Sequence, residues 1–421
     1  MIKILNKLFS QLKNYNHLHL SFVNIRKETL VEKIFNSIEG FSEESEIRYV
    51  GGCVRKIINK ELVDDIDLAV NLTPNEVIKS FKKNNIRFYE TGIKHGTITA
   101  FINNKSFEIT SLRKDVKTDG RHAKVEFSKE WKQDASRRDF TINSIYADIE
   151  GNLFDPFNGK KDLKDGKINF IGDPEKRIKE DYLRILRYIR FYLNYSKNKH
   201  DPNIIKFIKK NLEGIHKISA ERLLDEFKKL CKSNGVNNLS KDKFCCEIIS
   251  LVFPQFKNIQ ILNNLDSKDF EDLDFIILIS LLIIDTSDNT EYFLYKFRLS
   301  KTNEKRILFL KNFFSSSINK TTFTKKNLWK IFYFNGKESL LDLLNYQKLK
   351  SKKDNKKMLD LIKFFQDKKP PSFPVKANNL MEKYNISEGK ELGIKLKKIE
   401  EIWLDNNFEI SENEIKVLFK R

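Results

Sequence analysis

The sequence predicts an α+β region within about the first 165 residues, followed by an all-α remainder. Between residues 28 and 165, short apolar runs of strand type alternate with glycine turns and helical segments. Beyond residue 200, apolar residues recur with helical spacing almost throughout. The most apolar run, residues 275–284, is about half of the ~20 residues that a membrane-spanning helix needs. It therefore predicts a buried helix, and no membrane partner is expected.

The composition indicates a folded intracellular protein with a polyanionic partner. The chain has 421 residues, enough for roughly two to four domains, and 40% of them are apolar. A net charge of +20 and a pI near 9.4 favour a polyanion, although genomic base composition can explain part of the Lys excess. The cysteines show no metal-ligand spacing, which predicts reduced thiols; they are Cys53, Cys231, Cys245 and Cys246.

Residues 1–27 form a basic extension that contains no acidic residue. This pattern has two interpretations. An organellar import segment is one of them, and a basic amphipathic helix or loose terminus beside the next domain is the other. Because Arg and Ser are scarce in the segment, we favour the second interpretation and expect a cytoplasmic protein.

A glycine turn ends the first expected strand of the α+β region, near residue 50. Gly51 and Gly52 carry no Cβ, so the backbone can turn tightly there and approach a bulky ligand. A helical segment follows over residues 54–59, and its first N–H groups favour a phosphate.

A carboxylate pair comes next, in the run Asp64-Asp65-Ile66-Asp67-Leu68. In a strand, alternate residues share a face, so we expect Asp65 and Asp67 to project together. A divalent cation relieves the repulsion between two such carboxylates, and oxygen ligands suit Mg²⁺ that also bridges substrate phosphates. An Asp-rich turn without chemistry is the alternative, and the preceding glycine turn and basic helix argue against it.

Two further segments are expected near this pair. Residues 107–110 alternate as another strand, which makes Glu108 the candidate for a third carboxylate, with a solvent-facing Glu as the alternative. Residues 115–126 are charged and contain a glycine, so we expect a mobile loop on the rim of the site.

Residues 137–144, RRDFTINS, form the second candidate motif. Arg137 and Arg138 suit triphosphate oxygens, because the guanidinium group is a planar fork of donors. Asp139 beside them can accept a hydrogen bond from a ribose hydroxyl. A surface ion pair between these residues is the alternative, and it does not explain the whole string.

Residues 180–191, EDYLRILRYIRF, form the third. Asp181, Arg184 and Arg187 recur every three residues, which predicts one shared helix face. An acceptor and a fork of donors one turn apart can read a base edge, since Asp accepts from the amino group that cytosine and adenine both carry. An ordinary ion pair between residues three apart is the alternative.

These motifs, in this order, resemble the nucleotidyltransferase superfamily, and closely the class II tRNA CCA-adding enzymes and bacterial poly(A) polymerases. The family usually opens with Gly-Gly-x-Val-Arg-Asp. This chain has Gly51, Gly52, Val54 and Arg55, but Lys56 stands where the family has Asp.

The flexible loop of CCA-adding enzymes also has a counterpart. Residues 119–123 match it, and the resemblance implies that Asp119 and Arg121 belong to this loop, with Arg121 ordering on nucleotide binding or simply solvated. Residues 91–97 and 119–122 look more like the CCA branch than the poly(A) branch.

The resemblance implies a nucleotidyltransferase head with a small mixed β-sheet, followed by an all-α neck, body and tail. The expected boundaries are an extension over 1–27, the head over 28–165, the neck over 166–235, and a tRNA-binding body and tail over 236–421. Arg138 is expected to hold phosphate, Asp139 to read the 2′-hydroxyl, and Asp181 with Arg184 to replace a nucleic-acid template. The nucleotide contacts implied are Gly51, Gly52, Arg55, Arg138, Asp139, Asn143, Asp181, Arg184, Arg187 and Arg190.

The expected function is template-independent addition of CCA to tRNA 3′ ends from CTP and ATP, with release of pyrophosphate. Asp65 and Asp67 are the expected Mg²⁺ ligands, and Glu108 the expected catalytic assistant. Poly(A) polymerase, CC-only or A-only addition, and a catalytically silent RNA-binding homologue remain alternatives.

The tail is basic, with 27 Lys and Arg against 15 Asp and Glu over residues 301–421. Its interleaved aromatic residues suit either an RNA-binding surface or helix cores, and we favour the cores. Since all six histidines lie at or before His216, we expect no His-Asp phosphohydrolase domain in it.

Overall fold

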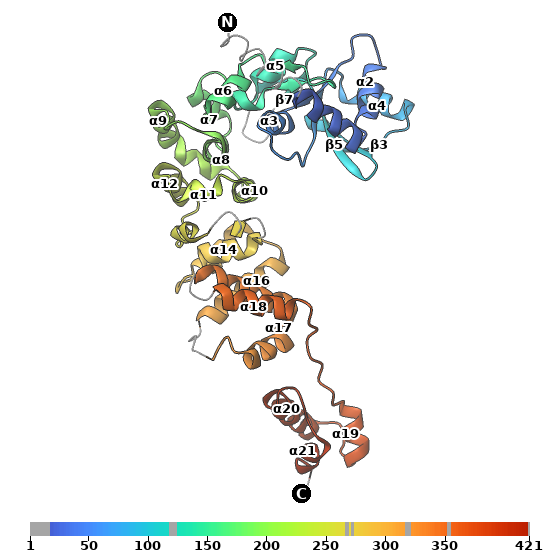
Figure 1. Cartoon of the computed structure of the whole chain (residues 1–421), viewed down its shortest axis with the longest axis vertical. Helices are drawn as coiled ribbons and strands as arrows, with labels where there is room; N and C mark the ends of the chain where they lie inside the picture. The colour runs from blue at the N-terminus through green and yellow to red at the C-terminus, as the bar shows by residue number, and fades with distance from the viewer. Residues whose placement is uncertain are drawn as a thin grey trace, which may run out of the picture. The chain divides into compact units, whose positions relative to one another are not determined.

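The computed structural model describes residues 17–117, 124–265, 269–270, 273–315, 321–351 and 355–419. The chain forms two compact units, Met1–Asn238 and Leu239–Arg421. The first unit holds a sheet with helices on both faces, and the second is helical (Figure 1).

A seven-stranded mixed sheet forms the centre of the first unit, in the order β3-β4-β5-β2-β1-β8-β9. Only β2 and β5 run parallel, and the other neighbours are antiparallel. A separate two-stranded ribbon pairs β6 with β7. The strands are β1 Ile47–Val50, β2 Asp67–Val70, β3 Arg87–Gly92, β4 Thr97–Ile102, β5 Lys105–Ser111, β6 Arg113–Lys117, β7 Lys124–Phe127, β8 Tyr146–Ala147 and β9 Leu153–Phe154.

Helices cover one face of this sheet with the larger apolar core. A helix over residues 17–29 contributes Phe22, which is fully buried, and packs with α2 (Glu32–Glu39), α3 (Gly52–Ile58) and α4 (Pro74–Lys83). The strands contribute their inward residues, among them Leu68 and Ile109. Residues 17–29 are therefore a helix packed on the head. Residues 1–16, which make up most of the basic extension, lie outside the described residues, so its interpretation stays a prediction.

The opposite face carries a smaller core with α5 (Trp131–Ser136), where Ala69 of β2 meets Ala135 and Tyr146. Because side chains alternate along a strand, Asp67 shares the face of Ala69. Helical segments complete the unit: η2 Thr141–Asn143, α6 Gly159–Asp165, α7 Pro174–Glu180, α8 Arg184–Tyr195, α9 Pro202–Asn211, η3 Leu212–Lys217, α10 Ala220–Cys231 and α11 Val236–Leu239.

The second unit is helical throughout its described residues. Its most apolar helix, α14 (Phe275–Ile283), is almost entirely buried, as the sequence predicted. The other helices are α12 Lys243–Val252, η4 Ile259–Asn264, α15 Asn289–Phe297, α16 Lys301–Ser315, α17 Lys325–Lys350, α18 Asn355–Gln366, α19 Ala377–Tyr384, α20 Lys390–Asp405 and α21 Glu412–Val417. Among the described helices, none is long and apolar enough to cross a membrane.

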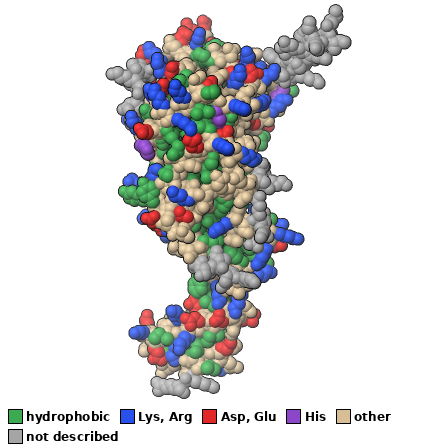
Figure 2. All heavy atoms as spheres, turned by 90° about the vertical axis from the view of Figure 1, so that its left-hand side faces the viewer, with side chains coloured by type: hydrophobic (Ala, Val, Ile, Leu, Met, Phe, Trp, Pro, Cys, Tyr) green, Lys and Arg blue, Asp and Glu red, His purple; other side chains and the backbone are tan. Residues whose placement is uncertain are grey.

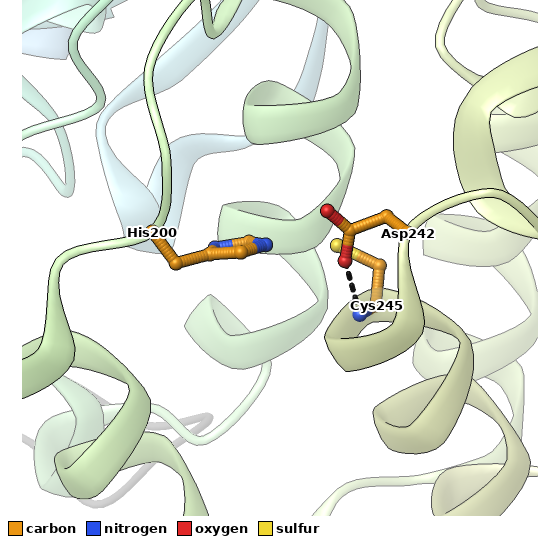
Figure 3. A group of neighbouring side chains, drawn as sticks. All are labelled: His200, Asp242 and Cys245. Carbon is orange, nitrogen blue, oxygen red and sulfur yellow. Dashed lines mark hydrogen bonds between the residues drawn. The ribbon is translucent and has the colours of Figure 1, made fainter.

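The cysteines are free thiols, and Cys245 illustrates their structural surroundings. The Asp242 carboxylate caps α12 by accepting from the Cys245 amide at 2.8 Å (Figure 3). Burial raises the pKa of the Cys245 thiol, so it stays protonated at neutral pH.

Candidate active site

Two carboxylates lie side by side on the face of the sheet that α5 covers. Asp67 begins β2 and pairs in register with Glu108 of the parallel strand β5. Burial, followed by the charge of Glu108, raises the pKa of Asp67 above its usual range. A cation at this position would offset both the burial of the Asp67 charge and its repulsion from Glu108. The two carboxylates therefore fit a divalent metal with oxygen ligands.

Asp65 does not lie in the strand, which corrects the expectation that Asp65 and Asp67 alternate along it. The strand begins only at Asp67, and Asp65 sits in the irregular segment before it, with its side chain exposed. The Asp65 amide donates to Oδ1 of Asp64 at 3.1 Å. The position of Asp65 therefore depends on this segment and not on strand pairing.

The glycine turn brings Asp67 and Arg138 near each other. Gly51 has φ +68°, a conformation that favours glycine, and a Cβ there would lie 3.4 Å from Nη1 of Arg138. A Cβ at Gly52 would lie 4.0 Å from Oδ2 of Asp67. The turn thus leaves open the space between a guanidinium group and a carboxylate, as the approach of a phosphate requires.

Arg138 is held by a buried acid that the sequence analysis did not single out. Its Nη2 donates to Asp134 at 3.2 Å, and its Nε donates to the Tyr146 hydroxyl at 3.0 Å. Arg137 also donates to Asp134, at 2.6 Å. Burial alone would raise the pKa of Asp134, but the two guanidinium groups lower it to about 2. The only signal in the sequence was the spacing of three and four residues between Asp134 and the arginines.

Asp139 joins the head to α8. Its Oδ2 accepts from Nε of Arg187 at 2.5 Å, and its Oδ1 accepts from Asn143 at 2.9 Å. Burial opposes the charge, but Arg187 and Asn143 lower the pKa of Asp139 to about 2. Asn143 in turn accepts from Arg55, whose guanidinium lies 4.8 Å from the centre of the Phe191 ring. The sequence placed these residues in separate motifs, and the structure brings them together.

Asp181 lies at the junction of α7 and α8, which corrects the expectation of one helix face. Its backbone is extended, and α8 begins only at Arg184. One carboxylate oxygen accepts from the Leu183 amide at 3.2 Å, and the other from Arg222 of α10 at 2.7 Å. The carboxylate is therefore fixed from two directions.

Arg184 begins α8, and its Nη1 donates to Glu180 and to the Arg177 carbonyl, each at 2.6 Å. Arg177 reaches back to the head and donates to the Arg137 carbonyl at 2.5 Å. These contacts tie the expected base-reading residues to the expected phosphate-binding segment.

A second pair links α8 to α10. Arg190 donates to Glu226, which is 2% exposed, at 2.5 Å. Arg177, Arg222 and Glu226 could not be identified from the sequence. Their partners lie about 40 residues away, and no short-range pattern indicates such a distant contact. Arg222 and Glu226 do lie four residues apart on α10, whose N-cap is Ser219.

Comparisons with known proteins decide the family. Residues 47–169 match the model of the poly A polymerase head domain. The human protein CCA tRNA nucleotidyltransferase 1, mitochondrial, is 35% identical over 395 residues, which cover 90% of this chain and 87% of the human protein. The chain belongs to the CCA tRNA nucleotidyltransferase family. It is thus an enzyme of tRNA processing, as the motifs predicted.

Other members support the same family and fold. The CCA-adding enzyme of Lactobacillus helveticus is 38% identical over 201 residues, which are 47% of this chain and 48% of that enzyme. The crystal structure of the Bacillus stearothermophilus CCA-adding enzyme in complex with CTP superposes with a TM-score of 0.70 at 20% identity. It covers 91% of this chain and 95% of that one, so the predicted fold class is confirmed.

Two features of the family, the flexible loop and the acidic residue of the opening motif, can be compared with this structure. Asp119 and Arg121, which the resemblance assigns to the family's flexible loop, lie outside the described residues. The two ends of the expected loop segment are strands, β6 and β7, which corrects the prediction of a loop over all of 115–126. Lys56, at the position where the family has Asp, pairs with Oδ1 of Asp64.

Proposed function

We propose that this chain adds CCA to tRNA 3′ ends without a nucleic-acid template, using CTP and ATP and releasing pyrophosphate. The observation that carries the proposal is the registered pair Asp67 and Glu108 beside the open glycine turn. The human relative, named CCA tRNA nucleotidyltransferase 1, is 35% identical over a stretch that covers 90% of this chain, and this supports the choice of reaction.

Asp65 and Asp67 are the proposed metal ligands, with Glu108 assisting. Two Mg²⁺ ions would lower the pKa of the attacking 3′-hydroxyl and stabilise the leaving oxygens. Glu108 is exposed, so it can turn toward the ligands from the neighbouring strand. The pKa of Asp67, raised by burial and by Glu108, supports the role, because carboxylates that repel each other in the free protein gain most from a bound cation.

Arg138 is proposed to hold the triphosphate, across the glycine turn from Asp67. Its Nε and Nη2 face Asp134 and Tyr146, whereas its Nη1 lies toward Gly51 and, among the described residues, donates only to the Asn143 carbonyl, at 3.4 Å. One edge of the guanidinium is thus fixed by protein, and the other faces the turn. Such preorganisation avoids ordering a flexible side chain when the nucleotide binds.

Asp139 is proposed to accept from the ribose 2′-hydroxyl. It is already ionised and held by Arg187 and Asn143. The Phe140 amide also donates to Oδ1 of Asp139, at 2.9 Å, so the 2′-hydroxyl would share an acceptor oxygen with one of these donors. Arg55, Asn143, Arg187 and Arg190 would then keep this carboxylate and α8 in place.

Asp181 and Arg184 are proposed to read the base. Asp181 would accept from the amino group of cytosine or adenine with the lone pairs that Leu183 and Arg222 leave open. The hydrogen bonds that Arg184 makes to described residues come from Nη1, so Nε and Nη2 can donate to ring nitrogen or carbonyl. Solved neighbours of this fold include CCA-adding enzymes in complex with ATP and with CTP, which fits one site that serves both bases.

The proposed macromolecular partner is the acceptor end of tRNA. A neighbour from Thermotoga maritima was solved in complex with tRNA, at a TM-score of 0.58. Lys and Arg side chains are spread over the face of the molecule in Figure 2, interspersed with acidic ones. This distribution favours many weak phosphate contacts over one concentrated patch.

We propose a cytoplasmic location, with organellar import as the alternative that the human, mouse and zebrafish relatives, named as mitochondrial, support. Phe22 is fully buried in the head core. An import segment cleaved after Phe22 would therefore remove part of the core, so we expect any cleavage to fall before Phe22. Cell fractionation with N-terminal sequencing of the mature protein distinguishes the two locations.

The decisive experiment uses tRNA transcripts that end at the discriminator base, at C and at CC, each with CTP, ATP or both. We expect three additions to the first transcript and stopping after A. Continued A addition would indicate a poly(A) polymerase, and a stop after CC or a need for CC would indicate a partial enzyme. No addition by wild type that still binds tRNA would refute catalysis altogether.

A further inference from the structure

The segment that carries Asp65 has no sheet pairing, so other contacts must hold it. It runs from the end of α3 at Ile58 to the start of β2 at Asp67. The Glu61 amide donates to the Lys56 carbonyl at 2.8 Å, and the Tyr195 hydroxyl donates to the Glu61 carboxylate at 3.1 Å. These two bonds hold the first half of the segment. In the second half, Val63 and Ile66 pack partly buried against the core, and the exposed Asp64 and Asp65 lie between them.

Lys56 and Asp64 make the polar contacts next to Asp65. The Lys56 ammonium donates to Oδ1 of Asp64, and the same oxygen accepts the Asp65 amide at 3.1 Å. One carboxylate oxygen thus connects a helix side chain to the backbone of Asp65. The Lys56 side chain is only 26% exposed, which limits its freedom to leave this partner.

We propose that Lys56, through Asp64, is the positioning residue for Asp65 as a metal ligand, an inference that rests on the metal role proposed above. Lys56 replaces the acidic residue of the family opening, and Asp64 supplies the acid that gives the lysine its partner. The pair is therefore a compensated arrangement, and restoring Asp at position 56 damages it. Two carboxylates would then face each other beside Asp65 and Asp67, and their repulsion would displace the segment.

The chain offers a matched control. Lys60 lies four residues further along the same connection, is exposed, and adopts φ +60°, a conformation that Asp tolerates better than most residues. Lys60→Asp changes the net charge by the same amount as Lys56→Asp, but among the described residues it removes no ion pair with Asp64. The difference between the two variants isolates the contact from the charge.

The measurement is Mn²⁺ binding to the full-length protein without nucleotide or tRNA, by calorimetry or electron paramagnetic resonance, together with thermal melting. We expect Lys56→Asp to weaken Mn²⁺ binding about three- to tenfold more than Lys60→Asp, while Lys56→Arg stays within about twofold of wild type. Melting temperatures should remain close, because the pair lies at the surface and contributes little to global stability.

A double-mutant cycle adds a test that does not depend on introducing a new charge. Asp64→Asn keeps the acceptor for the Asp65 amide but loses the attraction to Lys56. Lys56→Met and Asp64→Asn should therefore be non-additive, with the double variant binding Mn²⁺ no more weakly than the weaker single variant.

The inference is overturned if Lys56→Asp binds Mn²⁺ as tightly as Lys60→Asp, or if the two single effects add fully. These results are separate from the proposed function. A wild-type protein that binds Mn²⁺ at this site but adds nothing to tRNA would refute the function and leave the positioning role intact.

Discussion

Asp134→Asn tests whether the buried acid of α5 (Trp131–Ser136) organises the phosphate-binding side of the site. Asp134 is 1% exposed and accepts from Arg137, Arg138 and the Tyr146 hydroxyl at 2.6–3.2 Å. Asparagine keeps the shape but removes the charge, so two guanidinium groups lose their counter-ion. The expected consequences are lower stability of the first unit and a less well-oriented Arg138.

The lowered pKa of Asp134 gives the size of the expected loss of stability. A carboxyl whose pKa falls from 3.8 in the unfolded chain to about 2 in the folded one gains about 2.5 kcal/mol of stability at neutral pH, at about 1.36 kcal/mol per pKa unit. For a unit of this size that corresponds to a melting temperature about 5–10 °C lower in Asp134→Asn. Because the folded pKa is depressed, the contribution is fully present above pH 3.8 and disappears as pH falls toward 2.

Thermal melting between pH 7 and pH 2 is the assay. The difference in melting temperature between wild type and Asp134→Asn should be constant above about pH 4.5 and should disappear at lower pH. Asp225→Asn, an exposed acid on α10 (Ala220–Cys231), should leave the melting curve unchanged at every pH. If Asp134→Asn does not fold, Tyr146→Phe removes one hydrogen bond to the same carboxylate and should cost about 1.5–3 kcal/mol. A pH-independent gap, or none, would refute the reasoning.

Three further results are expected. Asp67→Asn should remove the Mg²⁺-dependent rise in melting temperature and slow nucleotide addition on the order of a thousandfold in single-turnover assays. It should not destabilise the metal-free protein, because it relieves repulsion from Glu108. Near-normal turnover would exclude Asp67 as a metal ligand. Asp139→Ala should narrow the preference for CTP over dCTP, and an unchanged ratio would assign sugar selection elsewhere. Replacing the exposed Lys397 and Lys398 by Gln should flatten the salt dependence of tRNA binding by roughly 0.7–0.9 for each phosphate that these lysines neutralise in the wild type, and an unchanged slope would make their charges merely compositional.

Local chemistry explains which parts of the site could be predicted from the sequence. Three features can be recognised from a few consecutive residues each: the Gly51-Gly52 turn, the carboxylates near residue 65 and the arginines near residue 138. Glu108 could be singled out because strand alternation was visible around it, and the structure pairs it in register with Asp67. Helical periodicity likewise made the buried helix at residues 275–283 predictable.

Tertiary contacts explain the rest. Asp139 pairs with Arg187, 48 residues away, and Asp181 pairs with Arg222, 41 residues away. No pattern within a segment specifies these partners. Two positions were also assigned to the wrong local structure. Asp65 precedes the strand because pairing with β5 (Lys105–Ser111) begins only at Asp67, and Asp181 precedes α8 (Arg184–Tyr195) because the chain turns there before the helix starts.

The turn at Asp181 bears on the proposed reading of the base by this residue. A carboxylate on a continuous helix would rotate about its side-chain bonds and could move away from a mismatched edge. Asp181 is instead held by the Leu183 amide and by Arg222. UTP presents a carbonyl where CTP has an amino group, so a fixed acceptor would face another acceptor. Leaving such a group unpaired costs about 1–3 kcal/mol.

Arg222→Ala should therefore relax discrimination against UTP by about tenfold while it changes CTP addition less, because Asp181 could then turn aside. Asp181→Ala should relax it at least as much and also slow CTP and ATP addition. Lys229→Ala, an exposed cation on the same helix as Arg222, serves as the control and should change neither. The measurement is single-turnover addition of each of the four nucleotides by each variant. If Arg222→Ala slows all four nucleotides equally, Arg222 supports the fold of the neck without orienting the acceptor, and the selectivity must come from Arg184 or from the tRNA.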